Sequence, residues 1–108
     1  VSSAELRQTY ICTHGLALHA FGLLGNALLL EDEEVDWAEV GRRLGEIDWR
    51  RSNTALWEGR AISAGRVQKG YLNVILTTNA LKQHLGVTLS AEEQAAEYAF
   101  TAPRKGTR

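Results

Sequence analysis

A long run without any formal charge, from Ile11 to Leu30, constrains this chain more than any other feature. It is long enough to span a membrane, but its histidines, glycines, threonine and asparagine make it a poor candidate for insertion, and we predict no membrane contact. Residues of one helical face recur at alternating steps of four and three. They are Tyr10, His14, Ala17, Phe21, Leu24 and Leu28. We therefore predict a helix from about Ala4 to Leu30, capped by Ser2 or Ser3, and buried at the centre of the fold because it is apolar on most sides.

A thin stripe of small and polar residues follows the other side of this predicted helix. It consists of Gly15, His19, Gly22 and Asn26. Each glycine costs about 1 kcal/mol relative to alanine inside a helix. We expect the close approach of another helix to offset that cost, with a kink as the alternative.

Capping signals and apolar spacing predict further helices along the chain. Asp36 with Glu39 starts one that ends at Gly45 or Ile47, and Ser52 or Asn53 starts a short one over Thr54–Glu58. Tyr71–Leu85 follows, ended by Gly86, although the β-branched run from Val74 to Thr78 argues for a strand. Ser90 with Glu93 starts a last helix that ends near Phe100, while residues 59–70 read as either a short strand or a loop.

The predicted fold is all-α: a compact array of four to five helices around the long N-terminal helix. Length allows one domain over residues 1–100, followed by a flexible tail at 101–108. The chain begins with valine and has no methionine, so we interpret it as a fragment of a longer protein. A lone Cys12 excludes an internal disulfide and is compatible with the reducing cytoplasm, where we place the protein.

Metal and catalytic sites are not predicted. Cys12, His14 and His19 are close in sequence, but their spacing does not place a ligand pair on one helical face. Apolar surroundings raise the pKa of a thiol, which argues against Cys12 as a nucleophile. No cofactor is expected, and the residues fill none of the standard enzymatic roles.

The segment between Trp49 and Gly70 carries the most concentrated positive charge. This segment contains five basic residues and one acidic residue, Glu58, although the whole chain has a net charge of −1. They are Arg50, Arg51, Arg60, Arg66 and Lys69. Basic side chains on such a connection reach phosphates, so we predict DNA contact here, with Trp49 and Trp57 as scaffold. The alternative is a solvated loop whose arginines pair with the acidic run from Glu31 to Asp36.

Three stretches of this sequence resemble the C-terminal region of DndB-type proteins: IDWRRSNTALWEGRA, NVILTTNALKQHLG and LSAEEQ. That family is associated with bacterial DNA phosphorothioate (DNA sulfur) modification and is related to DGQHR-domain proteins. The DGQHR motif itself is absent.

The resemblance implies a DNA-binding transcriptional regulator of the modification genes, without phosphorothioation activity of its own. DNA, a missing N-terminal domain of the same protein and a second copy are the expected partners. Two alternatives stay open: an interaction or dimerisation module without DNA contact, and a non-catalytic part of an enzyme whose active site lies upstream.

Overall fold

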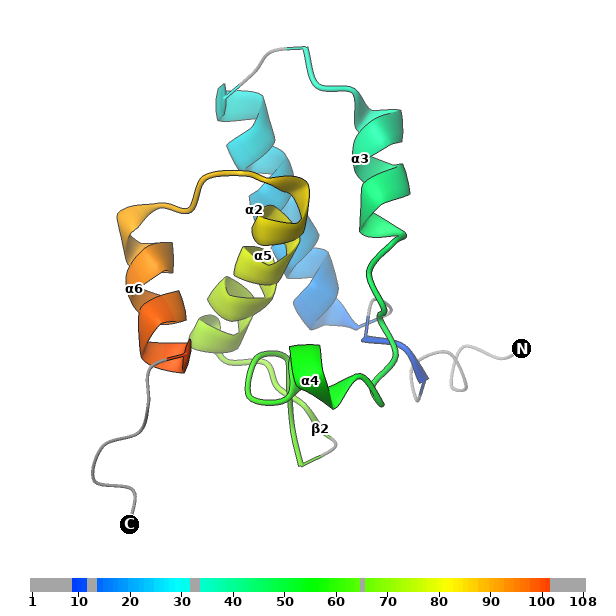
Figure 1. Cartoon of the computed structure of the whole chain (residues 1–108), viewed down its shortest axis with the longest axis vertical. Coiled ribbons are helices and arrows are strands. Elements are labelled where there is room, and N and C mark those ends of the chain that lie inside the picture. The colour runs from blue at the N-terminus through cyan, green and yellow to red at the C-terminus, as the bar shows by residue number, and fades with distance from the viewer. Residues whose placement is uncertain (1–8, 12–13, 32–33, 65, 102–108) are drawn as a thin grey trace.

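The computed structural model describes residues 9–11, 14–31, 34–64 and 66–101, and it is mostly helical (Figure 1). Its helices and strands are, in chain order, α2 (Gly15–Glu31), α3 (Trp37–Leu44), α4 (Thr54–Trp57), β1 (Ile62–Ser63), β2 (Arg66–Val67), α5 (Tyr71–Leu85) and α6 (Ala91–Thr101). The all-α prediction is confirmed in the main. The segment that the sequence left undecided forms a small antiparallel hairpin, in which Ile62 pairs with Val67 and Ser63 with Arg66.

Helix α5, not the N-terminal helix, lies at the centre of the fold. Every residue from Val74 to Lys82 is buried. Helices α2, α3 and α6 all pack against α5 (Figure 1). The β-branched run inside α5 is helical, and the Thr78 hydroxyl donates a hydrogen bond to the Val74 carbonyl, 2.8 Å away. Burial on all sides therefore outweighs the strand preference of these residues.

The prediction of one continuous helix from Ala4 to Leu30 is wrong, because the helix is interrupted at Tyr10 and Ile11 and α2 begins only at Gly15; residues 4–8 lie outside the described part of the chain. The Ile11 amide donates to the Trp49 carbonyl at 2.9 Å, and the Arg51 amide donates to the Thr9 carbonyl at 2.9 Å. Backbone groups that bond to a distant segment in this way do not continue a helix. The predicted cap at Ser2 or Ser3 lies outside the described residues.

Helix α2 is buried along one face only. Leu16, Ala17, Ala20 and Leu24 are buried. A Cβ atom added at Gly15, Gly22 or Gly25 would meet nothing within 4 Å. The expectation of burial on most sides, with a second helix close to the glycines, is therefore wrong for this helix.

The predicted helix ends are confirmed where local signals set them. Asp36 accepts a hydrogen bond from the Glu39 amide at 3.1 Å, and Gly86 ends α5 with a left-handed φ of 78°. Ser90 and Glu93 form a reciprocal capping box: the Ser90 amide donates to Glu93 Oε1 at 2.8 Å, and the Glu93 amide donates to Ser90 Oγ at 3.2 Å.

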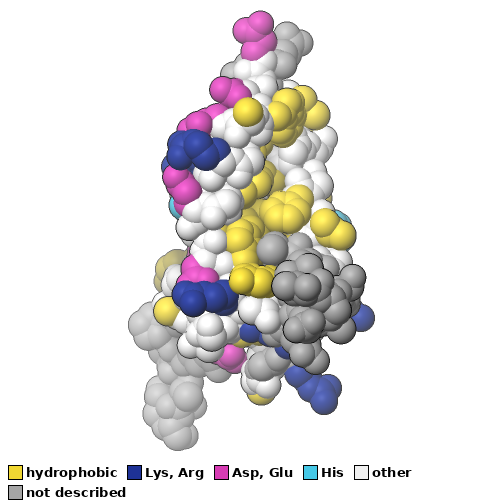
Figure 2. Space-filling model, turned by 90° about the vertical axis from the view of Figure 1, so that its right-hand side faces the viewer, with side chains coloured by type: hydrophobic (Ala, Val, Ile, Leu, Met, Phe, Trp, Pro, Cys, Tyr) yellow, Lys and Arg dark blue, Asp and Glu magenta, His cyan; other side chains and the backbone are white. Residues whose placement is uncertain are grey.

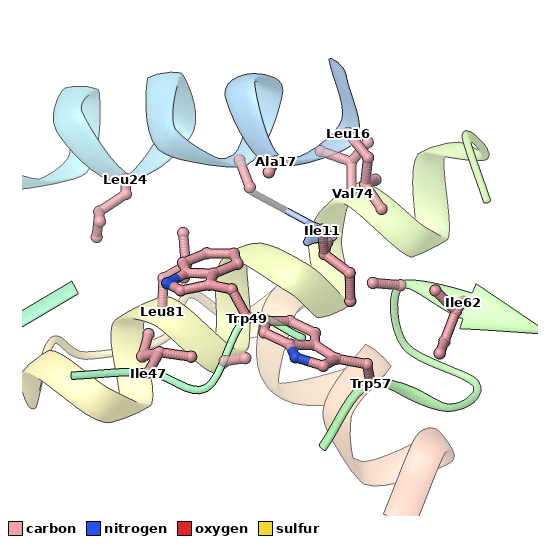
Figure 3. Packing of buried hydrophobic residues seen from close by; sticks show 13 residues of the cluster. Ile11, Leu16, Ala17, Leu24, Ile47, Trp49, Trp57, Ile62, Val74 and Leu81 are labelled. Atoms are coloured by element: carbon pink, nitrogen blue, oxygen red, sulfur yellow. The ribbon is translucent and has the colours of Figure 1, made fainter. Parts of the chain in front are cut away.

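Two tryptophans tie the connection after α3 to the core (Figure 3). The rings of Trp49 and Trp57 stack with centroids 5.2 Å apart. Trp49 Nε1 donates to the Leu44 carbonyl at 2.9 Å, and Trp57 Nε1 donates to the Asp48 carbonyl at 2.8 Å. Both indoles are thus buried with their polar atom bonded, which confirms the predicted scaffold role. Among the described residues, no helix is long and apolar enough to cross a membrane.

A candidate nucleic-acid interface

Two of the predicted arginines, Arg50 and Arg51, lie beside the N-terminal end of α2. Tyr10 and Arg50 pair in an isolated antiparallel bridge. Arg51 lies beside them, and its Nη2 is 3.1 Å from Nε2 of His14, the residue that precedes α2. Because Trp49 anchors this segment, Arg50 and Arg51 keep a fixed position next to the start of the helix.

Arg50 is largely exposed and bonds to a carboxylate on the same segment. Its Nε and Nη2 donate to Asp48 at 2.9 and 2.8 Å. These hydrogen bonds, together with one from the Arg50 amide, lower the pKa of Asp48 to about 2. An ion pair this exposed contributes little to stability, so Arg50 can exchange Asp48 for another anion at small cost.

The β1–β2 hairpin presents Arg66 to solvent. Ile62 and Val67 pair on the inward side of the hairpin, whereas Ser63 and Arg66 pair on the exposed side. The alternation of side chains along each strand produces this division. Arg66 is therefore held outward by the same register that buries Ile62.

Lys69 follows the hairpin and is exposed beside a cleft at the start of α2. The cleft has a volume of about 340 Å³. Its lining combines Lys69 with two histidines and several apolar residues: His14, Gly15, Leu16, His19, Val67 and Val74. The N-terminus of α2 borders this cleft through Gly15 and Leu16, and the N-terminus of a helix carries a partial positive charge. Lys69 and the α2 terminus thus face the same space.

We call Arg50, Arg51, Arg66 and Lys69 the basic surface. They come from two segments of the chain that meet around the start of α2, at the end of the molecule that carries the hairpin (Figure 1). Two carboxylates of the described residues lie on the same segments: Asp48 bonds to Arg50, and Glu58 accepts a hydrogen bond from the Ala64 amide at 3.2 Å. This surface gathers four of the cations of a chain whose net charge is −1.

Arg60 does not belong to the basic surface, which corrects its prediction as a phosphate contact. Its side chain is buried, and its two Nη atoms donate to Glu97 at 2.9 and 2.8 Å. Nη1 also donates to the Leu76 carbonyl at 2.7 Å, and the guanidinium lies 4.6 Å from the centroid of the Phe100 ring. The charge of Arg60 is thus neutralised inside the protein and holds α6 in place.

His14 lies on the apolar face of the predicted N-terminal helix and His19 in its small and polar stripe, but in the structure both line the cleft beside Lys69. The sequence indicated only that the two histidines lie near each other, because both are close to the start of the uncharged run. What they contact depends on the hairpin, which is far away in sequence. Within the described residues, no three His, Cys, Asp or Glu side chains gather as metal ligands; Cys12 lies outside those residues.

Comparison with known proteins identifies one family. The chain matches the family model of DndB, described as DNA-sulfur modification-associated, over residues 1–88. The matched span includes the whole basic surface and ends before α6. No curated protein and no solved structure matches the chain.

Proposed function

The chain belongs to the DndB family of DNA-sulfur modification-associated proteins, and we propose from this membership that it is a helical domain of a DNA-binding transcriptional regulator. The proposal assigns it no catalytic step. The basic surface is the observation that supports DNA contact, because its four cations gather around one end of the molecule, with Arg51 half-buried and the other three exposed. Phosphate contacts of this kind position a protein on a duplex without reading its sequence.

Arg66 and Lys69 are the best phosphate contacts in this proposal. Both are exposed, and both lie on or directly after the hairpin, where the backbone register and the cleft orient them. Arg50 and Arg51 stand beside them at the start of α2. Four cations that gather in this way attract a polyanion even when the chain as a whole is slightly acidic.

Salt-dependent binding to duplex DNA tests the proposal. We expect the fluorescence anisotropy of a labelled duplex to report binding that weakens steeply with salt. The double variant Arg66→Ala/Lys69→Ala should bind every sequence more weakly. The slope of log K against log salt should flatten by about 0.9 for each phosphate that the variant no longer neutralises.

Arg42→Ala is the matched control. Arg42 is an exposed arginine on α3 that pairs with Glu39 and Glu46, away from the basic surface. Its removal also subtracts one positive charge, but we expect the salt slope to stay the same. A double variant at Arg66 and Lys69 that binds DNA like the unmodified chain would refute the assignment.

A further inference from the structure

An apolar groove lies between α2 and α3. It has a volume of about 240 Å³, and residues of both helices line it: Phe21, Leu24, Gly25, Leu28, Trp37, Val40, Gly41 and Leu44. Both helices pack on α5, which leaves a space between them. Trp37 stays 49% exposed at the groove, and a Cβ atom added at Gly25 or Gly41 would meet nothing within 4 Å. The groove is therefore open to an incoming side chain.

A stripe of exposed leucines borders this groove on α2. Leu18 is 62% exposed and Leu29 is 53% exposed. Gly22 and Gly25 lie between these two leucines in the sequence. The four residues follow one another at steps of four, three and four positions, which places all of them along one side of the helix. Leu30, at the end of the helix, is 81% exposed. Figure 2 shows hydrophobic side chains gathered in a long strip on one face of the molecule.

Exposed apolar surface of this extent on adjoining elements marks a docking site. Full burial of one leucine side chain is worth roughly 1.5–3 kcal/mol. Leu18 and Leu29, together with the half-exposed Trp37, therefore offer a large gain to any surface that covers them. The occupant must be apolar along its middle, because α2 carries no charge from Gly15 to Leu30.

The charges at the two ends of α2 select the occupant. Arg50 and Arg51 lie at its N-terminal end. At its other end Glu31 closes the helix, and Asp36 starts α3 a few residues later. An uncharged middle with a basic and an acidic end is complementary to itself when a second helix runs in the opposite direction. A parallel copy would instead place like charges together.

We propose that two copies of the chain form a dimer in which their α2 helices lie antiparallel across the α2–α3 groove. A two-fold axis between Leu23 and Leu24 places Leu18 of one copy opposite Leu29 of the other. It places Gly22 opposite Gly25, so the helix backbones approach closely at the axis. Such a self-complementary contact closes after two subunits. The proposed contact shares Arg50 and Arg51 with the basic surface, but it does not depend on DNA binding.

The first test measures the oligomeric state by sedimentation equilibrium, with circular dichroism to confirm folding. We expect a dimer for the unmodified chain and a monomer for Leu18→Glu/Leu29→Glu, whose substituted side chains are exposed and outside the core. Leu72→Glu/Tyr98→Glu is the matched control, because it places two charges at exposed residues of α5 and α6 and should stay dimeric.

Two outcomes of this test would overturn the proposal. One is a chain that stays monomeric at concentrations up to about 1 mM, where even a weak contact forms. The other is a dimer that survives both glutamate substitutions on α2. A monomeric chain would mean that the groove binds a different protein. A dimer that survives the substitutions would mean that the two copies meet at another surface.

A second test measures the direction of the helices by disulfide formation, in a chain with Cys12→Ser, or Cys12→Ala if the serine variant loses its circular dichroism signal. A mixture of Leu18→Cys and Leu29→Cys chains should form covalent dimers, whereas each chain alone should not. Two copies of residue 18 would lie about 16 Å apart along antiparallel helices at 1.5 Å per residue. A disulfide tolerates only about 7 Å between Cα atoms. Efficient self-linking of the Leu18→Cys chain would indicate parallel helices, and no linking in the mixture would contradict the contact; either result overturns the proposal.

Discussion

Helix α5 packs against α2 through apolar side chains and against α6 through charges. On the α2 side, Val74 and Leu81 belong to the cluster that also holds Leu16 and Leu24 (Figure 3). On the other side, α6 contributes no buried residue at all. It is held instead by two ion pairs, each 2.8 Å long and with side chains no more than 14% exposed. Lys82 of α5 pairs with Glu93, and Arg60, which lies between α4 and β1 and donates to the Leu76 carbonyl of α5, pairs with Glu97.

The two sides should respond differently to pH. The hydrogen bonds of Arg60 are the main cause that lowers the pKa of Glu97, against the opposing effect of burial. Burial raises the pKa of Glu93, but hydrogen bonds from Lys82 and Ser90 outweigh it, so that the pKa is lowered overall. A carboxyl group with a lowered pKa in the folded state stabilises the fold above its unfolded pKa, near 4.3, and this contribution is lost as the pH falls. The contact between α5 and α2 is made by apolar side chains, so its contribution to stability should not change over this pH range.

The largest effect is expected on the apolar side. Leu81 is fully buried, and Leu81→Ala removes its contacts and leaves a cavity, so we expect a loss of about 4 kcal/mol in the free energy of unfolding. Urea titration followed by circular dichroism at pH 7 and pH 4 measures it. The loss should be the same at both pH values, and a loss that halves at pH 4 would remove the distinction between the two sides. Leu81→Met is the control and should cost less than about 1.5 kcal/mol.

The ion pair at Glu97 should give the second largest effect. Glu97→Gln keeps the shape of the side chain but leaves the Arg60 charge buried without its counter-charge. We expect a loss of about 3 kcal/mol at pH 7. As the pH falls below the unfolded pKa and then through the lowered folded pKa of Glu97, the difference from the unmodified chain should shrink, because Glu97 is protonated first in the unfolded chain and then also in the folded chain. Urea titrations across pH 3 to 7 measure this change.

Glu92→Gln is the control for Glu97, since it removes a charge from an exposed position of the same helix. We expect its stability to follow that of the unmodified chain. An apolar exchange sharpens the comparison further: Arg60→Met/Glu97→Leu should recover most of the loss, because a packed apolar pair replaces a buried ion pair at little or no cost. A Glu97→Gln variant as stable as Glu92→Gln would show that the pair does not hold α6.

The local features of the fold could be read from the sequence, because neighbouring residues determine them. Asp36, Gly86 and Ser90 set helix ends through contacts within a few residues, and all three were predicted. The choice of the central helix could not be read in this way. The run from Ile11 to Leu30 is more apolar than α5, whose polar Asn79 and Lys82 suggest exposure until α6 supplies their bonding groups.

The basic surface shows the same limit. Arg66 and Lys69 are exposed, as their polar, glycine-bearing segment indicated, and their contact with DNA stays a prediction. Arg60 resembled them in sequence, but Glu97, which neutralises it, is 37 residues away. A charge pattern within one segment carries no information about such a distant carboxylate.

The smallest effect should come from the cap that begins α6. Ser90→Ala removes the hydroxyl that accepts from the Glu93 amide, and the loss of such a cap costs about 1 kcal/mol. Because α6 buries no residue and is held by polar groups, we expect hydrogen exchange to accelerate in α6 while the amides of α2 and α5 keep their protection. Asp36→Ala removes the equivalent cap from α3 and should leave exchange in α6 unchanged. If Ser90→Ala accelerates exchange equally in α5, the helix does not open on its own, and the ionic side of α5 is as firmly joined to the core as the apolar side.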